Sequence, residues 1–470
     1  MNFEAVIGLE LHVQMKTKSK MFSSTPVSFG EKPNTMVKVY DMAFPGSMPI
    51  VNKQAVINAI RVSNALHMTI DDTLCFDRKN YFYSDLAKGF QITQHERPIG
   101  SNGYLDIGNK RIRLERLHIE EDTCKQIHLG DYSLLDYNRS GIPLLEIVTL
   151  PDMRNGKEAM KLVEKIRSIV TFLDVSDGKM EEGSLRCDVN ISIREVGSDR
   201  LGPKVEIKNL NSISNVQKAI DYEIERQKQL FLEGKNIVQD TRRFDEKNKN
   251  TVAMRFKTDS IDYKYFREPN IPPIKLSKEF IQNAIETSPE LAEAKYERYL
   301  AMGLSKYDAS LLVQDKDVSN YFDEAIETKA SNKLLVNWIF GDIHAILNKE
   351  NISIKQFIVS PKHLGELVLM IENGIVSNKQ GREVFMEMLK NNDSPKELIK
   401  SMGREMISDE NVIKEMVIET INNNPQSVID YKKGKDRAVA YLIGQIMKKS
   451  QGRANPSLTN KLIQEELRRR

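Results

Sequence analysis

The chain has 470 residues, 40% of them hydrophobic, and a formal net charge of +3 at pH 7. This length predicts about three domains with ordinary packed cores, and no apolar run reaches the roughly 20 residues that a membrane-spanning helix needs. The N-terminal segment lacks the pattern of a secretory signal peptide. Three widely spaced cysteines argue against a disulfide framework and a cysteine-based zinc site, so we expect a cytoplasmic protein without membrane association.

Four segments in the first half of the chain alternate apolar and polar residues, as strands with one buried face do. They are residues 3–15, 117–122, 183–194 and 204–208. One-sided alternation is typical of an antiparallel sheet whose apolar face packs on helices. The candidate covering helices are residues 52–66, 156–173 and 216–231.

The chain changes character near residue 293, where helical periodicity replaces short strands. Pro272 and Pro273 close the first part, because tandem prolines stop regular structure. In the last part, Asn455 followed by Pro456 is typical of a helix start. We therefore predict an α+β fold with a domain built on an antiparallel sheet (1–292), an all-α domain (293–400) and a small all-α tail domain (401–470).

The polar faces of the four strand segments carry residues suited to a divalent cation. A solvated sheet face is the alternative, and it is favoured for any single strand. Carboxylates that converge from four segments, however, need a cation to offset their repulsion. Because oxygen ligands dominate and a lone histidine does not make a zinc site, magnesium is favoured over zinc. The candidate ligands are Glu10, His12, Glu120, Glu121, Asp188 and Glu206.

Basic residues near these strands suit phosphate chemistry, which needs cations and positioning more than a strong nucleophile. The run FDRKNYFYSDLAKGFQ supplies Lys79 and Lys88, and the polar strand faces add Arg186 and Lys208. The sequence contains neither a Walker loop nor the motifs of protein kinases, so any use of ATP requires a different fold.

The C-terminal segment is strongly basic. Residues 401–430 contain two basic and six acidic residues, whereas residues 431–470 contain eleven basic and three acidic ones. This distribution predicts a polyanion-binding surface, and a solvated lysine-rich helix surface fits the charge alone equally well. The candidate RNA-binding residues are Lys432, Lys433, Lys435, Arg437, Lys448, Lys449 and Arg453.

Several long strings of the sequence stand in the order seen in one enzyme family. They are VIGLELHVQ, FDRKNYFYSDLAKGFQITQ, LHIEED, LLDYNRSGIPLLEIVT, GSLRCDVNISI, VEIKNLNS, MRFKTDSIDYKYFREPNIPP and YKKGKDRAVAYLIGQIMKKSQGRANPSLTNKL. In this order they resemble the B subunits of aspartyl/glutamyl-tRNA amidotransferases. The resemblance covers nearly the whole chain and is weakest between about residues 275 and 400.

The resemblance implies a heterotrimer in which an A subunit hydrolyses glutamine, a small C subunit links A and B, and the B subunit holds the kinase and transamidase site. It implies a cradle domain related to the glutamine synthetase and guanido kinase fold, then a helical domain and a tRNA-recognising tail. The implied reaction uses ATP and Mg²⁺ to phosphorylate the side-chain carboxylate of Glu-tRNA(Gln), Asp-tRNA(Asn) or both. Ammonia channelled from the A subunit then displaces the phosphate.

Carried over residue by residue, the family's metal and phosphate site falls on the six candidate ligands named above. Lys79 and Lys88 fall beside phosphate or carboxylate groups, and Arg186 and Lys208 are assigned similar roles by the resemblance. The catalytic candidates are therefore Glu10, His12, Lys79, Lys88, Glu120, Glu121, Arg186, Asp188, Glu206 and Lys208.

The chain departs from the family pattern at several positions. Ser84 and Ala87 replace prolines, and this predicts a looser loop around Lys88 because proline lowers the entropy lost on ordering. Further departures are Thr123, Cys124, Arg267 and Asn270. Two other functions remain open: a non-catalytic tRNA-holding scaffold, and a free-standing magnesium-dependent kinase for a small carboxylate. The intact acidic residues speak against the first, and the basic tail against the second.

Overall fold

The computed structural model describes residues 2–256, 262–403, 407, 409–432 and 437–470. The chain divides into two compact units, Met1–Ala292 and Glu293–Arg470. Strands are confined to the first unit, and the described part of the second is helical, so the predicted mixed N-terminal region and helical C-terminal region are confirmed. No helix among the described residues is long and apolar enough to cross a membrane.

A nine-stranded sheet forms the centre of the first unit, in the order β14-β13-β12-β11-β1-β10-β7-β6-β2. The strands are β1 (Phe3–Gln14), β2 (Thr69–Ile70), β6 (Gly100–Ile107), β7 (Lys110–Glu121), β10 (Pro143–Thr149), β11 (Leu185–Glu195), β12 (Val205–Lys208), β13 (Asp240–Asp245) and β14 (Asn250–Phe256). Neighbours pair antiparallel, as the alternation predicted, except that β12 and β13 are parallel. A helix connects these two strands, which is the crossover that parallel pairing requires.

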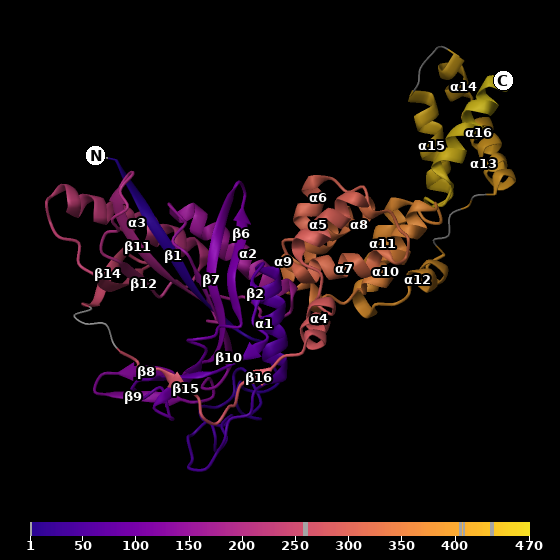
Figure 1. The fold of residues 1–470 in the computed structure, drawn as a ribbon. Helices are drawn as coiled ribbons and strands as arrows, with labels where there is room; N and C mark the ends of the chain where they lie inside the picture. The colour runs from indigo at the N-terminus through magenta and orange to yellow at the C-terminus, as the bar shows by residue number, and fades with distance from the viewer. Residues whose placement is uncertain (1, 257–261, 404–406, 408, 433–436) are drawn as a thin grey trace. The chain divides into compact units, whose positions relative to one another are not determined.

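Three helices contact this sheet, as Figure 1 shows. They are α1 (Lys53–Ala65), α2 (Gly156–Phe172) and α3 (Ile213–Leu232). All three predicted covering helices are confirmed. The third begins three residues earlier than expected because the Ser212 hydroxyl caps it by accepting a hydrogen bond from the Asn215 amide. Leu9 and Leu11 of β1 are buried in the same core as Ile60, Leu162 and Ile220 of the helices.

Small elements complete the first unit. A three-stranded sheet has the order β15-β4-β5 and joins the segment before α4 to residues far earlier in the chain. The elements are β3 (Thr73–Leu74), β4 (Asp77–Asn80), β5 (Phe90–Thr93), β8 (Lys125–Leu129), β9 (Tyr132–Asp136), β15 (Phe266–Arg267), β16 (Ile274–Lys275) and α4 (Lys278–Glu286). Helix α4 packs against α1.

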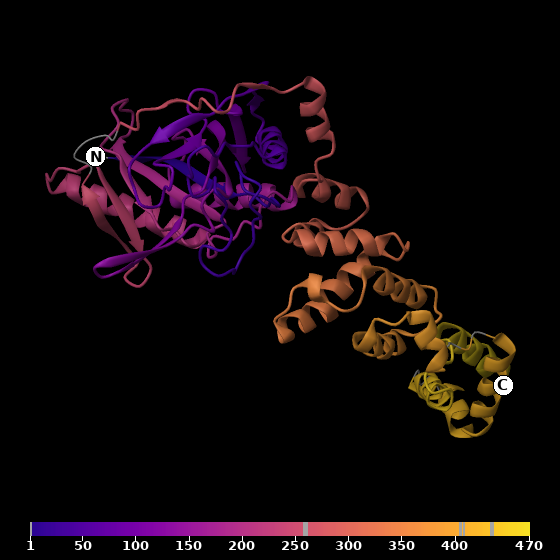
Figure 2. The ribbon, with the colours of Figure 1, turned by 90° about the horizontal axis from the view of Figure 1, so that it is seen from below.

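The second unit contains two hydrophobic cores, one formed between Tyr299 and Ile399 and one between Ile413 and Leu467. Its helices can be followed in Figure 2. They are α5 (Ala292–Ala301), α6 (Lys306–Leu312), α7 (Lys316–Ile326), α8 (Asn332–Trp338), α9 (His344–Glu350), α10 (Pro361–Glu372), α11 (Asn378–Asn391), α12 (Pro395–Ser401), α13 (Glu410–Asn422), α14 (Pro425–Lys432), α15 (Arg437–Lys449) and α16 (Pro456–Arg469). A π-helical turn, Ile339–Ile343, separates α8 from α9. The predicted helix start is confirmed, since the Asn455 side chain caps α16.

Candidate active site

Strand pairing brings ionisable residues into one row across the middle of the large sheet. His12 on β1 lies opposite Arg186 of β11 on one side and opposite Glu146 of β10 on the other. Glu146 in turn lies opposite His118 of β7. Side chains directly opposite one another in a sheet lie on the same face. The pairing therefore gathers residues that are up to 174 positions apart in the sequence.

The centre of the row is an acidic cluster, which we define as Glu10, His12, His118, Glu120 and Glu146. The His12 Nε2 atom lies 3.4 Å from Glu146 Oε2, 3.7 Å from Glu120 Oε1 and 3.9 Å from Glu10 Oε1. The His118 Nε2 atom lies 3.2 Å from Glu146 Oε2 and 3.7 Å from Glu120 Oε2. Two sets of three ligand atoms, which share Glu146, each lie within 4.8 Å of one another.

Burial and charge set the protonation of this cluster. Burial raises the pKa of Glu10, and the neighbouring Glu146 carboxylate raises it further. Burial alone would lower the pKa of His118, but the negative charges of Glu146 and Glu120 outweigh it and raise that pKa to about 9. Burial opposes ionisation of Glu146 as well, yet the positive charge of His118 holds its pKa well below the usual value.

These directions describe a concentration of negative charge that the positive charge of His118 partly offsets. A divalent cation could take the place of that positive charge, because metal ligands must be deprotonated and metal binding releases protons. The His118 Nδ1 atom is buried and has no hydrogen-bond partner among the described residues. Each set offers two carboxylates and one imidazole, so the oxygen ligands that hard divalent cations prefer outnumber the nitrogen ligand.

Glu146 was missed by the sequence analysis, and His118 was noted only as part of a strand. A signal for Glu146 is present, since it interrupts the apolar run PLLEIVT on a strand with buried neighbours. An ionised residue in such a run needs a partner to be tolerated. His118 and Glu146 are both less than a tenth exposed.

The remaining predicted acidic residues lie beside this cluster in two groups. Asp188 stands opposite Glu10 on β11, and Lys208 joins Asp188 to Glu206 through ion pairs of 2.6 and 3.0 Å. Glu121, although adjacent in sequence to Glu120, instead pairs with Lys88 at 2.7 Å. Its other carboxylate oxygen accepts a hydrogen bond from the backbone amide of Ile92.

The other predicted cations border the same sheet face. Burial lowers the pKa of Lys79, but the nearby Glu120 charge outweighs it and raises that pKa above its usual value. The Lys88 Nζ atom lies 5.0 Å from the centre of the Tyr40 ring. Arg186 donates a hydrogen bond of 2.8 Å to Asp122. All four predicted cations thus have an acidic neighbour.

Five of the seven predicted RNA-binding residues lie in the described part of the tail, and Lys433 and Lys435 lie outside it. Lys432, Arg437, Lys448 and Lys449 are exposed on α14 and α15, and Arg453 is partly exposed after α15. Lys449 forms an ion pair with Glu419, and Lys432 donates to the carbonyl of Arg470.

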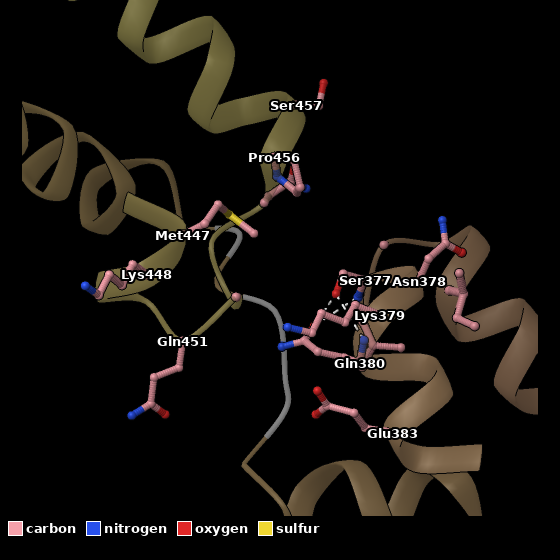
Figure 3. A pocket seen from close by; sticks show the side chains of 15 residues that line it. Ser377, Asn378, Lys379, Gln380, Glu383, Met447, Lys448, Gln451, Pro456 and Ser457 are labelled. Atoms are coloured by element: carbon pink, nitrogen blue, oxygen red, sulfur yellow. Dashed lines mark hydrogen bonds between the residues drawn. The ribbon is translucent and has the colours of Figure 1, made fainter. Parts of the chain in front are cut away.

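A hollow of about 920 Å³ lies within the second unit and is shown in Figure 3. Ser377, Asn378, Lys379 and Gln380 line it where α11 begins. From the end of α15 to the start of α16 it is lined by Met447, Lys448, Gln451, Gly452, Asn455, Pro456 and Ser457. Glu383 is the single acidic residue among the lining residues. This hollow does not resemble a metal site, so the acidic cluster of the first unit is the better candidate for phosphate chemistry.

Comparison with known proteins gives the same family for both units. The family model described as "GatB/GatE catalytic domain" matches residues 5–282, and the one described as "GatB domain" matches residues 320–467. The B subunit of the aspartyl/glutamyl-tRNA(Asn/Gln) amidotransferase of Lysinibacillus sphaericus (strain C3-41) is 47% identical over 475 residues, which cover 100% of both chains. The B subunits of the same enzyme from Bacillus cytotoxicus and Persephonella marina are each 46% identical, again over 100% of both chains. The predicted family is confirmed: this chain belongs to the B subunits of aspartyl/glutamyl-tRNA(Asn/Gln) amidotransferases, which are ligases that use glutamine as amide donor.

Proposed function

We propose that this chain phosphorylates the side-chain carboxylate of a misacylated Glu-tRNA(Gln), Asp-tRNA(Asn) or both, and that ammonia then converts the product to the amide. The single observation that carries the proposal is the acidic cluster, in which candidate metal ligands from different strands lie together. The predicted cations lie beside this cluster. The names of the relatives, which specify aspartyl/glutamyl-tRNA, support the substrate class.

The chemistry follows from charge. A free carboxylate resists attack by ammonia because its negative charge repels the electron pair of nitrogen. When a carboxylate oxygen attacks the γ-phosphorus of ATP, the bond to ADP breaks and an acyl phosphate forms. Ammonia then adds to the acyl carbon, phosphate leaves with the former bonding pair, and a proton is lost from nitrogen.

The side chains take separate roles in this reaction. Glu10, His12, Glu120 and Glu146 would hold magnesium, with Asp188 and Glu206 completing the ligand set across β11 and β12. Bound magnesium would supply positive charge to neutralise the phosphate oxygens. Lys79, Lys88, Arg186 and Lys208 bind the phosphate and carboxylate oxygens, and Glu121 positions the Lys88 ammonium through their ion pair.

The rest of the assembly belongs to the same proposal. A glutaminase A subunit supplies ammonia through an internal channel, and a C subunit joins A to B in the cytoplasm. Residues 1–292 form the catalytic domain, a cradle related to the glutamine synthetase and guanido kinase fold. Residues 293–400 form a helical domain, and residues 401–470 bind tRNA through Lys432, Lys433, Lys435, Arg437, Lys448, Lys449 and Arg453.

The test is amide formation by the chain co-expressed with A and C subunits, supplied with glutamine, ATP, magnesium and Glu-tRNA(Gln). Wild-type protein should form Gln-tRNA(Gln), and a Glu10→Ala variant should form none while it still binds tRNA. Absence of product from wild-type protein that binds tRNA well would favour the scaffold function instead. Turnover of a small carboxylate that survives deletion of residues 401–470 would favour the free-standing kinase.

A further inference from the structure

Four aromatic side chains form a row along the small sheet β15-β4-β5. Tyr81 follows β4, His95 follows β5, and Tyr263 and Tyr265 precede β15. The ring centres of Tyr81 and Tyr263 are 5.8 Å apart, and those of Tyr263 and Tyr265 are 6.0 Å apart, both in edge-to-face geometry. The rings of His95 and Tyr265 are stacked, with centres 3.9 Å apart and planes 7° from parallel. We call these four residues the aromatic row.

The aromatic row adjoins the acidic cluster through Lys79. The Lys79 Nζ atom lies 4.9 Å from the centre of the Tyr263 ring, and its ammonium interacts electrostatically with both Glu120 and Glu146. On β5, the Thr93 hydroxyl lies 3.5 Å from Glu120 Oε2, two residues before His95. Lys79 therefore lies over a middle ring of the row, and a ligand on the aromatic row has a cation and the candidate metal-ligand carboxylates beside it.

The backbone beneath the row is fixed by hydrogen bonds. The Asn80 amide donates to the carbonyl of Tyr263 at 2.9 Å, and the Asn80 side chain donates to the carbonyl of Lys264 at 2.7 Å. On the other side, the His95 amide donates to Asp77 Oδ2 at 2.8 Å. The rings thus stand on a preformed support, which reduces the entropy lost when a ligand binds.

Packing alone does not account for the row. Rings that served only to hold β15 against β4 would be buried between them, but Tyr265 is 36% exposed and His95 is exposed. Tyr81 and Tyr263 are half-buried beside them. The exposed rings of Tyr265 and His95 suit a flat ligand that stacks on them.

We propose that the aromatic row binds an adenine base and directs what is attached to that base toward Lys79 and the acidic cluster. Every base presents a flat π face to an aromatic side chain, and stacking of this kind stabilises bound nucleotides. The proposal rests on the proposed function, in which two substrates carry adenine. These are ATP and the 3′-terminal adenosine of tRNA, to which the amino acid is esterified.

The experiment measures binding by the full-length chain, purified with its partner subunits, using two pairs of probes. One pair is the magnesium complex of a non-hydrolysable ATP analogue and that of tripolyphosphate, which lacks the base. The other is deacylated tRNA(Gln) ending in CCA and the same tRNA ending in CC. The variants are Tyr265→Leu, which removes the ring, and Tyr265→Phe, which keeps it. Tyr104→Leu is the matched control, because Tyr104 also stacks on a histidine, His67, but on β6.

We expect Tyr265→Leu to raise the Kd of one adenine-bearing probe about tenfold. Weaker binding of the ATP analogue with unchanged tripolyphosphate binding assigns the row to ATP. CCA-ended tRNA that falls to the affinity of CC-ended tRNA assigns it to the terminal adenosine. Tyr265→Phe and Tyr104→Leu should remain within about twofold of wild type.

Two results overturn the proposal. If Tyr265→Leu binds both adenine-bearing probes as wild type does, the row has no role in base binding, and the proposed function stands. If tripolyphosphate binding falls together with that of the ATP analogue, the substitution has damaged the phosphate site rather than a base site. Failure of the proposed function has a different signature, since wild-type protein itself would then form no amide from Glu-tRNA(Gln), whatever Tyr265→Leu does to the binding of the probes.

Discussion

His12 and Glu146 lie directly opposite each other on adjacent strands, with His12 Nε2 3.4 Å from Glu146 Oε2. Glu146 reaches His118 on its other side, so one carboxylate belongs to both sets of metal-ligand atoms. This shared position makes Glu146 the most informative residue of the site, although the sequence analysis did not single it out.

We predict that Glu146→Gln lowers magnesium affinity and amide formation by about 100-fold or more, because it removes a negative charge common to both ligand sets. Magnesium titration by calorimetry and single-turnover amide formation are the measurements. Glu4→Gln is the control, since Glu4 lies on the same strand but pairs with Arg194 and Arg154 instead. Equal magnesium affinity in wild type and Glu146→Gln would remove the carboxylate from the proposed ligand set.

A second prediction concerns the pH dependence of the helical region. Burial raises the pKa of Asp323, but hydrogen bonds from Arg298 and Lys295 outweigh it, and the pKa is held below the usual value. A carboxyl whose pKa is lower in the folded protein stabilises it above the unfolded pKa of about 4 and loses that effect as pH falls. Asp323→Asn should therefore lower the free energy of unfolding most near pH 7. The loss there should be about 3 kcal/mol, because Lys295 is left buried without its carboxylate partner, and the loss should become progressively smaller below pH 4.

The single tryptophan provides the measurement. Trp338 is buried in the same hydrophobic core as Tyr299, whose hydroxyl donates to Asp323, so its fluorescence reports unfolding of this region. Urea titrations of wild type and Asp323→Asn at pH values from 3 to 7 give the difference in the free energy of unfolding between the two proteins at each pH. A difference that stays constant over this range would show that Asp323 does not contribute through its charge.

A third prediction concerns the loop that carries Lys88. The Leu86 amide bonds the Tyr83 carbonyl, and the Gly89 amide bonds the Leu86 carbonyl, so Ser84 and Ala87 each occupy the second position of a turn. Proline is favoured at that position because its fixed φ suits both common turn types. Ala87→Pro should stabilise the protein by about 0.4–1 kcal/mol, and Ala87→Gly should destabilise it. Thermal unfolding followed by circular dichroism shows whether each substitution raises or lowers Tm. A lower Tm for Ala87→Pro would mean that residue 87 does not adopt a proline-compatible φ.

A fourth prediction concerns the tail. Lys448 is exposed near the end of α15, and Lys448→Gln should weaken tRNA binding and reduce the slope of log K against log salt concentration by about 0.7–0.9. Filter binding between low and moderate salt gives the slope. Lys306→Gln on α6 removes an equally exposed charge outside the tail and should leave the slope unchanged. Equal slopes in both variants would place Lys448 away from the RNA.

The sequence predicted the parts of this fold that depend on local pattern. Alternation predicted β1 and β11, and amphipathic spacing predicted α1 and α2 within two residues at either end. The parallel β12–β13 pair and the alignment of β1 with β10 depend on contacts between distant segments, which local periodicity does not encode. Glu146 was missed for the same reason. A single acidic residue in an apolar strand can be recognised as part of a site only when strand pairing places His12 and His118 on either side of it.

The central position of β1 also affects how the protein is made. Strand β1 has both of its sheet neighbours far downstream in the chain, and roughly 170 residues separate Gln14 from Leu185, where β11 begins. At synthesis rates of about 5–20 residues per second, β1 waits on the order of ten seconds or longer for that partner. During this time the side chains that later form the core, such as Ile7, Leu9 and Leu11, are accessible to other chains. The yield of native protein therefore depends on shielding a single N-terminal strand during translation.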